Sequence, residues 1–103
     1  MNLQIDMSKT EEMVELQVAG DVTIQTSPQL RNALKPLFES QVGAIHVNLA
    51  GVEFMDSSGI ATLVEGLQWS KRTEGNFVLH ALTETVQDVF ELAKLDTIFE
   101  IQA

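Results

Sequence analysis

The chain has 103 residues, of which 45% are hydrophobic, and it contains no cysteine. This length suits one domain built round one core, expected over residues 1–103, and the lack of cysteine excludes disulfides, thiolate metal ligands and a cysteine nucleophile. Fifteen acidic and six basic side chains give a formal net charge of −9, so the chain repels phosphate backbones and anionic lipid headgroups, and we expect no nucleic-acid binding.

The apolar runs are all short, and residues 1–6 show no basic start, apolar signal core or cleavage site. We therefore expect neither export nor membrane insertion and take the cytoplasm as the default location. The acidic charge either serves solubility alone or complements a basic partner, and composition does not separate the two.

Two alternating patterns at the start of the chain predict an antiparallel pair of strands. Apolar residues recur at every second position over 3–7 and again over 14–18, with the polar stretch 8–12 between them. Alternation with period two is typical of strands that bury one face.

A helix is predicted after Gly20-Asp21. Ser27 is a good N-cap, and Pro28 then occupies the first helical position, where its missing N–H does no harm. Pro36 should bend or loosen the second half, and the helix should end near Gly43. One apolar stripe supports this helix: Leu30, Leu34, Leu37 and Phe38.

Residues 44–49 are mostly apolar and β-branched, which predicts a strand buried on both faces. The turn Asp56-Ser57-Ser58-Gly59 follows, and then a second amphipathic helix up to Lys71-Arg72. Its expected core stripe has helical spacing: Ile60, Leu63, Val64 and Leu67.

The last quarter of the chain predicts a strand over 77–81, a third helix and a closing strand over 97–101. The third helix rests on Val86, Val89, Phe90 and Ala93. The order β-β-α-β-α-β-α-β predicts an α/β fold, with a single mixed sheet of four to five strands flanked by three to four helices.

On a helical wheel, one group of residues in the second helix falls opposite its expected core stripe. This group is Thr62, Glu65, Gly66 and Trp69. An exposed tryptophan beside a small residue favours a protein-docking face. The alternative is that a loop or neighbouring strand covers Trp69.

Ser57 and Ser58 lie at the junction between a predicted strand and a predicted helix. A serine oxygen there can cap the free first-turn N–H groups, which is the structural interpretation. A phosphate on the same serine would also meet those donors and the positive end of the helix dipole. It would add negative charge to the adjacent surface and oppose docking with the fold intact.

Residues 52–60, Val-Glu-Phe-Met-Asp-Ser-Ser-Gly-Ile, resemble the phosphorylation motif of the STAS domain family, specifically its bacterial anti-sigma-factor antagonists. Further landmarks cover almost the whole chain: Gly20-Asp21 with Thr26, Pro28 and Leu30 behind it, Val47-Asn48-Leu49, and Val89-Phe90-Glu91-Leu92.

The resemblance implies that an anti-sigma factor serine kinase phosphorylates Ser57, with Ser58 as the alternate hydroxyl. It implies that the unmodified protein binds this kinase, that phosphorylation blocks binding, and that a phosphatase reverses the change. Many members carry an acidic residue at the position of Thr23, so this chain departs from the family there. The expected partner-binding residues are Asp21, Thr23, Asp56, Ser58, Gly59, Thr62, Glu65, Gly66 and Trp69.

We expect no enzyme, because a catalytic site needs a nucleophile with a base and an orienting group. His46 and His80 are isolated in predicted strands and are better interpreted as structural. The resemblance implies that nucleotide chemistry belongs to the partner, in keeping with the absence of a glycine-rich phosphate loop, and no cofactor is expected. The alternative function is a constitutive STAS subunit of a lipid-transport or stress-sensing assembly, which Thr23 suits slightly better.

Overall fold

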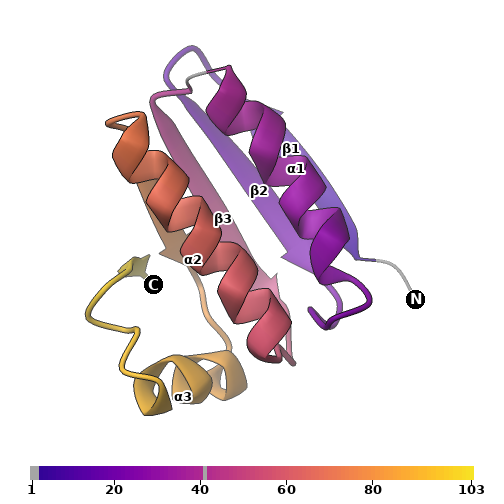
Figure 1. The fold of residues 1–103 in the computed structure, drawn as a ribbon. Coiled ribbons are helices and arrows are strands. Elements are labelled where there is room, and N and C mark those ends of the chain that lie inside the picture. Colours follow the sequence, from indigo (N-terminus) through magenta and orange to yellow (C-terminus); the bar gives the residue numbers. More distant parts are fainter. Residues whose placement is uncertain (1–2, 41) are drawn as a thin grey trace.

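The computed structural model describes residues 3–40 and 42–103, which form one mixed sheet with helices packed against it (Figure 1). The predicted fold class and element order are confirmed. The elements are β1 Gln4–Lys9, β2 Met13–Ala19, α1 Ser27–Glu39, β3 Ala44–Gly51, α2 Ser57–Arg72, β4 Asn76–His80, α3 Glu84–Leu92 and β5 Glu100–Gln102.

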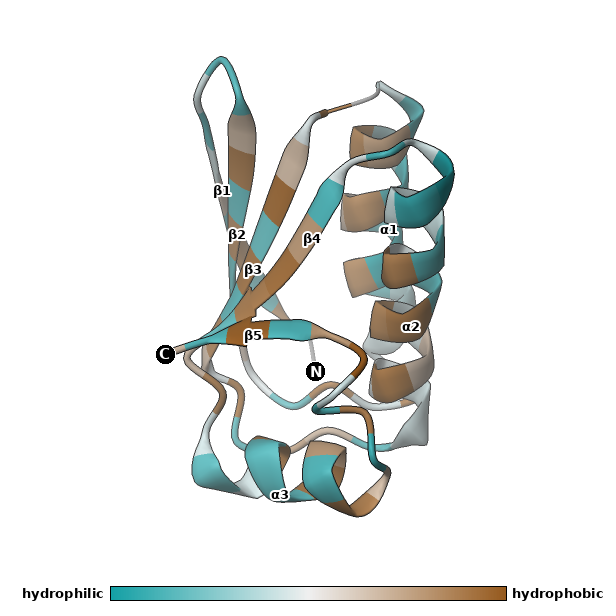
Figure 2. Ribbon diagram, turned by 90° about the vertical axis from the view of Figure 1, so that its left-hand side faces the viewer, coloured by the Kyte–Doolittle hydropathy of each residue, from teal (hydrophilic) through white to brown (hydrophobic). Residues whose placement is uncertain are grey.

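The five strands lie in the sheet in chain order, β1-β2-β3-β4-β5. β1 pairs antiparallel with β2, as predicted, and each later strand pairs parallel with the one before it. Because the chain always steps in the same direction across the sheet, right-handed crossovers put their helices on the same face. α1 and α2 accordingly cover one face together, while α3 lies beyond the end of the sheet (Figure 2).

The expectation that β3 is buried on both faces was wrong. Ile45, Val47 and Leu49 are buried under the helices, whereas His46 and Asn48 on the other face are half-buried. The one-directional strand order leaves that second face without a covering helix, so β3 alternates where a strand between two helical layers would be apolar throughout.

Several element boundaries differ from their predictions. α1 starts one residue earlier than expected, with Thr26 and not Ser27 at the N-cap, and it ends at Glu39. The final strand starts at Glu100 and not at Thr97, because the backbone N–H groups of Ile98 and Phe99 both turn back to the carbonyl of Leu95.

The core lies between the sheet and the two long helices. The whole predicted stripe of α1 is buried, and α3 contributes Val86 and Phe90. The side-chain hydroxyl of Thr83 donates to the carbonyl of Val52 at 2.7 Å, which ties the start of α3 to the segment that leads into α2. Within the described part of the chain, no helix has the length and apolarity that a bilayer crossing requires.

Candidate functional site

Asp56 caps α2 and at the same time holds a distant loop. Its Oδ1 accepts from the backbone N–H groups of Ser58 at 2.9 Å and Gly59 at 3.3 Å, which are two of the free donors of the first turn. Its Oδ2 accepts from the backbone N–H of Ile24 at 3.1 Å. One carboxylate therefore joins the start of α2 to the loop between β2 and α1.

The two serines are left for other roles, because the cap predicted for one of them is supplied by Asp56. Ser57 is the first residue of α2 and is exposed, and Ser58 is half-buried. The carbonyl of Ser58 accepts from the Thr62 hydroxyl at 3.0 Å. The hydroxyl directly after the aspartate thus reaches solvent at the positive end of the helix.

The loop before α1 is hydrogen-bonded to residues 54–56, which lead from β3 into α2. Val22 forms a parallel bridge with Met55, and its N–H and carbonyl bond to the backbone of Phe54 and Asp56, each at 3.0 Å. A side chain larger than hydrogen at Gly59 would collide with Val22 and Met55. Glycine is therefore needed here for the close approach of α2 to this bridge.

The loop also holds its own shape. The hydroxyl of Thr26 donates to the carbonyl of Asp21 at 2.7 Å and accepts from the backbone N–H of Thr23 at 2.9 Å. The hydroxyl of Thr23 accepts from the N–H of Gln25 at 3.2 Å. Asp21 is exposed and Thr23 is half-buried. Both predicted partner-binding residues of this loop lie beside the start of α2, because Val22 between them bonds to Asp56.

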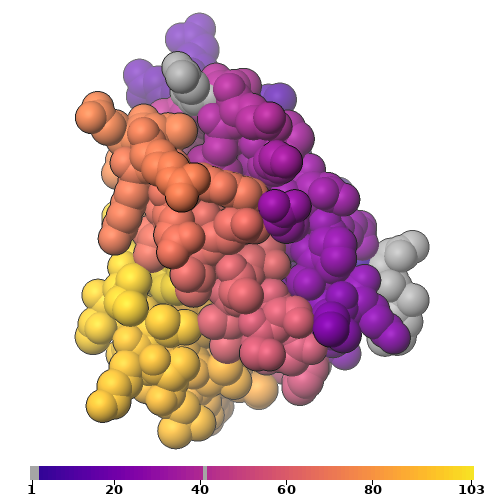
Figure 3. Space-filling view, viewed as in Figure 1, coloured from indigo at the N-terminus to yellow at the C-terminus, as the bar shows by residue number. Residues whose placement is uncertain are grey.

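Two exposed apolar side chains, not among the predicted site residues, belong to the two segments that meet at Asp56. Ile24 is 72% exposed and Phe54 is 48% exposed. Their pattern in the sequence is informative, because both are large apolar residues outside any helical or strand repeat. We define the switch surface as Asp21, Thr23, Ile24, Phe54, Asp56 and Ser57. The loop before α1 and the start of α2 meet on one face of the molecule (Figures 1 and 3).

The predicted docking face on the later turns of α2 was wrong in its orientation. Thr62 and Gly66 are buried, and they lie on a line with Gly59, Leu63 and Ser70. Three of the four residues expected to form the core stripe are only half-buried: Ile60, Val64 and Leu67.

The cause is a close approach between α2 and β4. A Cβ atom at Gly66 would lie 2.9 Å from the tip of the Phe77 ring, so the helix rests on the sheet through its small residues. A wheel weighted by large apolar side chains cannot detect such a face.

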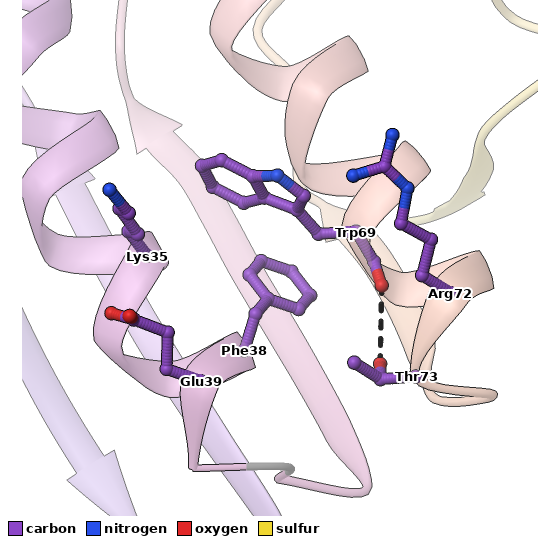
Figure 4. A pocket seen from close by; sticks show the side chains of 6 residues that line it. All are labelled: Lys35, Phe38, Glu39, Trp69, Arg72 and Thr73. Atoms are coloured by element: carbon purple, nitrogen blue, oxygen red, sulfur yellow. Dashed lines mark hydrogen bonds between the residues drawn. The ribbon is translucent and has the colours of Figure 1, made fainter.

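Trp69 contacts Phe38 of α1 (Figure 4), and Glu65 contacts the same helix through Arg31. The Trp69 ring packs on Phe38 with centroids 5.4 Å apart, and the Arg31 guanidinium lies 5.6 Å from its centre. Arg31 also bonds Glu65 at 2.7 Å, and this hydrogen bond, together with the Glu65 charge, raises the pKa of Arg31. Trp69 is half-buried, and the neighbouring segment that covers it is a helix, α1, and not the loop or strand considered as the alternative.

The two histidines, which were expected to be isolated, in fact contact each other across β3 and β4. His46 and His80 lie on the sheet face that α1 and α2 leave uncovered, with Nδ1 of His46 and Nε2 of His80 2.6 Å apart and their rings stacked. Among the described residues, no three His, Asp or Glu side chains are placed to hold a metal ion.

Comparisons with known proteins agree with this geometry. The family model described as "Mlab, STAS domain" matches residues 5–101. A Bacillus subtilis protein named anti-sigma-B factor antagonist is 30% identical over 103 residues, covering all of this chain and 94% of the relative.

Two solved structures share the fold. The anti-sigma factor antagonist SpoIIAA in its unphosphorylated form is 24% identical, with a TM-score of 0.82 over 98% of this chain and 87% of that one. The Bacillus cell fate determinant SpoIIAA in the phosphorylated form is 22% identical, with a TM-score of 0.75 over 98% and 90%. The predicted resemblance is confirmed, and the chain belongs to the STAS domain family.

Proposed function

We propose that this protein is an anti-sigma-factor antagonist, a binding switch that sequesters an anti-sigma factor kinase while Ser57 is unmodified. The observation that carries the proposal is that exposed Ser57 begins α2 directly after Asp56, which binds the loop that carries exposed Ile24, while exposed Phe54 lies in the segment leading into α2. A partner that covers these two side chains removes apolar surface from water and must pass over the serine. A phosphatase restores the unmodified form.

The fold can carry a phosphate on Ser57. The side chain is exposed and lies in the first turn of α2, where the helix dipole favours negative charge. Asp56 continues to cap Ser58 and Gly59 through Oδ1, so the modification disturbs no hydrogen bond of the cap.

A docked partner cannot accommodate the same phosphate. Phosphorylation adds close to two negative charges beside Asp56 and Asp21, on a surface that must lose its water when a partner binds. Removing that charge from water costs several kcal/mol unless an opposite charge meets it. Binding is therefore weakened without any change of fold.

The named relatives support this function over a constitutive subunit. The curated B. subtilis relative is named as an antagonist, and SpoIIAA keeps this fold in both its phosphorylated and unphosphorylated forms. At Thr23, where many members are acidic, the side-chain hydroxyl accepts a hydrogen bond from the backbone N–H of Gln25 in the same loop.

The test combines phosphorylation and binding with a purified candidate anti-sigma factor kinase from the same genome. Intact-mass and peptide analysis after incubation with ATP and Mg²⁺ should place one phosphate on Ser57. Ser57→Asp should weaken binding at least tenfold, which is about 1.4 kcal/mol. Ser57→Ala should bind and never be released. Ser58→Ala is the matched control and should behave as wild type.

A further variant, Ile24→Asp, tests the switch surface and should weaken binding while the fold persists, because this side chain is 72% exposed. Phosphate found on Ser58 alone would contradict the assignment of Ser57. Equal affinity of wild type, Ser57→Ala and Ser57→Asp would contradict the switch and favour the alternative of a constitutive binding subunit.

A further inference from the structure

A small apolar cup opens between the C-terminal ends of α1 and α2 (Figure 4). These ends lie opposite the start of α2, where the switch surface is (Figure 1). The volume of the cup is about 200 Å³, and it is lined by Lys35, Phe38, Glu39, Trp69, Arg72 and Thr73. Pockets for small-molecule ligands usually enclose roughly 300–1,000 Å³. A volume below that range suits one apolar side chain of a protein partner.

The rim of the cup is basic in a chain that is strongly acidic. Lys35 and Arg72 line it, and Arg31 lies over the Trp69 ring. Three of the six basic residues therefore lie near this tryptophan. Arg31 is paired with Glu65, so the cationic groups that the rim offers to a partner are Lys35 and Arg72, with Glu39 as the acidic residue of the lining. An apolar side chain flanked by carboxylates would complement both the floor and the rim.

The chain itself carries such a group at the end of α3. Leu92 is 86% exposed, and Asp88 and Glu91 lie beside it on the surface of α3. Residues 84–99 contain four acidic residues against one lysine, Lys94. We call Leu92 with Asp88 and Glu91 the acidic knob.

A molecule cannot place its own knob in its own cup. The cup lies at the C-terminal ends of α1 and α2, whereas α3 lies at the opposite end of the molecule, next to the start of α2 (Figures 1 and 3). We propose that the cup binds the acidic knob of a second copy of this chain, so that copies associate head to tail. Leu92 fills the cup, and Asp88 and Glu91 meet Lys35 and Arg72.

The association is weak and open-ended. A contact made by one apolar side chain and two pairs of charges buries less surface than the roughly 1,200 Å² that stable interfaces bury. The net charge of −9 does not forbid it, because charges more than about 8 Å apart are largely screened at physiological salt while the contacting pairs are not. In a two-fold dimer both contact sites are used, whereas a head-to-tail dimer leaves one cup and one knob free. Further copies can then bind, unless the chain of copies closes into a ring.

The test is sedimentation equilibrium of the full chain from about 10 µM to about 1 mM, a range that covers such weak affinities. The wild-type average mass should rise with concentration. Leu92→Asp removes the knob, and Lys35→Glu with Arg72→Glu reverses the rim of the cup. Each variant alone should raise the dissociation constant at least tenfold. All three side chains are exposed, and unchanged thermal melting checks the fold.

Mixing the two variants gives the decisive result. The first keeps its cup and the second its knob, so the mixture should form 1:1 dimers and nothing larger. Met7→Asp is the control, since this side chain is 42% exposed on β1, and it should associate as wild type does. A wild-type monomer throughout, association that survives either variant, or a mixture that stays monomeric overturns the proposal. Each readout is independent of Ser57 phosphorylation.

Discussion

Asp56 shows how one side chain can determine the chemistry of its neighbours. Both of its oxygens are used, Oδ1 on α2 and Oδ2 on the Ile24 N–H 32 residues earlier. Because this carboxylate satisfies the first turn, the serine hydroxyls are not needed as caps. The hydroxyl of exposed Ser57 is therefore free of a capping role because of the residue before it.

Gly59 is the position where one added carbon should be most damaging. A Cβ atom there would lie 2.6 Å from Cγ of Met55 and 2.7 Å from Cγ1 of Val22. We expect Gly59→Ala to lower the free energy of unfolding by about 1–2 kcal/mol, since overpacking outweighs the better helix propensity of alanine. Urea unfolding measures the change.

Gly43→Ala is the matched control, because its nearest neighbour would be the carbonyl oxygen of Glu12 at 3.5 Å, an ordinary contact. This variant should stay within about 0.5 kcal/mol of wild type. A Gly59→Ala protein as stable as Gly43→Ala would show that α2 does not pack against the bridge as described.

At the scale of elements, α2 illustrates why the densest contact need not be the most hydrophobic. Its buried line contains Gly59, Thr62 and Gly66, which let the helix axis come close to the sheet. The larger apolar side chains beside this line, Ile60, Val64 and Leu67, pack at its edges and remain half-buried. The predicted helix was correct, but its rotation was not.

α1 carries an apparent defect, Pro36, three residues before its end. Proline removes the N–H that would donate to the Asn32 carbonyl. We expect Pro36→Ala to raise the free energy of unfolding by about 1–2 kcal/mol, because the regained hydrogen bond exceeds the entropy returned to the unfolded chain. Thermal and urea unfolding give the value.

The comparison variant is Pro28→Ala in the first turn of the same helix, where the proline N–H is not needed. Here only the unfolded-state entropy changes, so a loss of about 0.4–1 kcal/mol is expected. Changes of the same sign in both variants would contradict this account of Pro36.

For the molecule as a whole, the net charge of −9 opposes compactness. The extents are 32 × 30 × 21 Å, so at about 0.01 M salt, where the screening length is about 30 Å, repulsion acts across the entire molecule. Raising salt to about 0.1 M shortens that length to about 10 Å and should raise Tm, by about 4–8 °C for each kcal/mol gained. Calorimetry at the two salt concentrations measures the shift.

The control is the double variant Glu11→Gln and Glu12→Gln, at two exposed positions between β1 and β2. It brings the formal net charge from −9 to −7 and should show a smaller rise of Tm with salt. A Tm that falls on adding salt would mean that attractive pairs such as Arg31 with Glu65 outweigh the repulsion.

The elements, their order and the serine at the start of α2 could be predicted from the amino-acid pattern alone, because periodicity, prolines and the Asp-Ser-Ser-Gly turn act within a few residues. Three features became visible only in the folded molecule: which face of α2 is buried, the uncovered face of the sheet, and the attachment of the loop that carries Ile24 to Asp56. Those features depend on contacts between residues distant in the chain, such as Gly66 with Phe77 and Asp56 with Ile24, which no local pattern encodes.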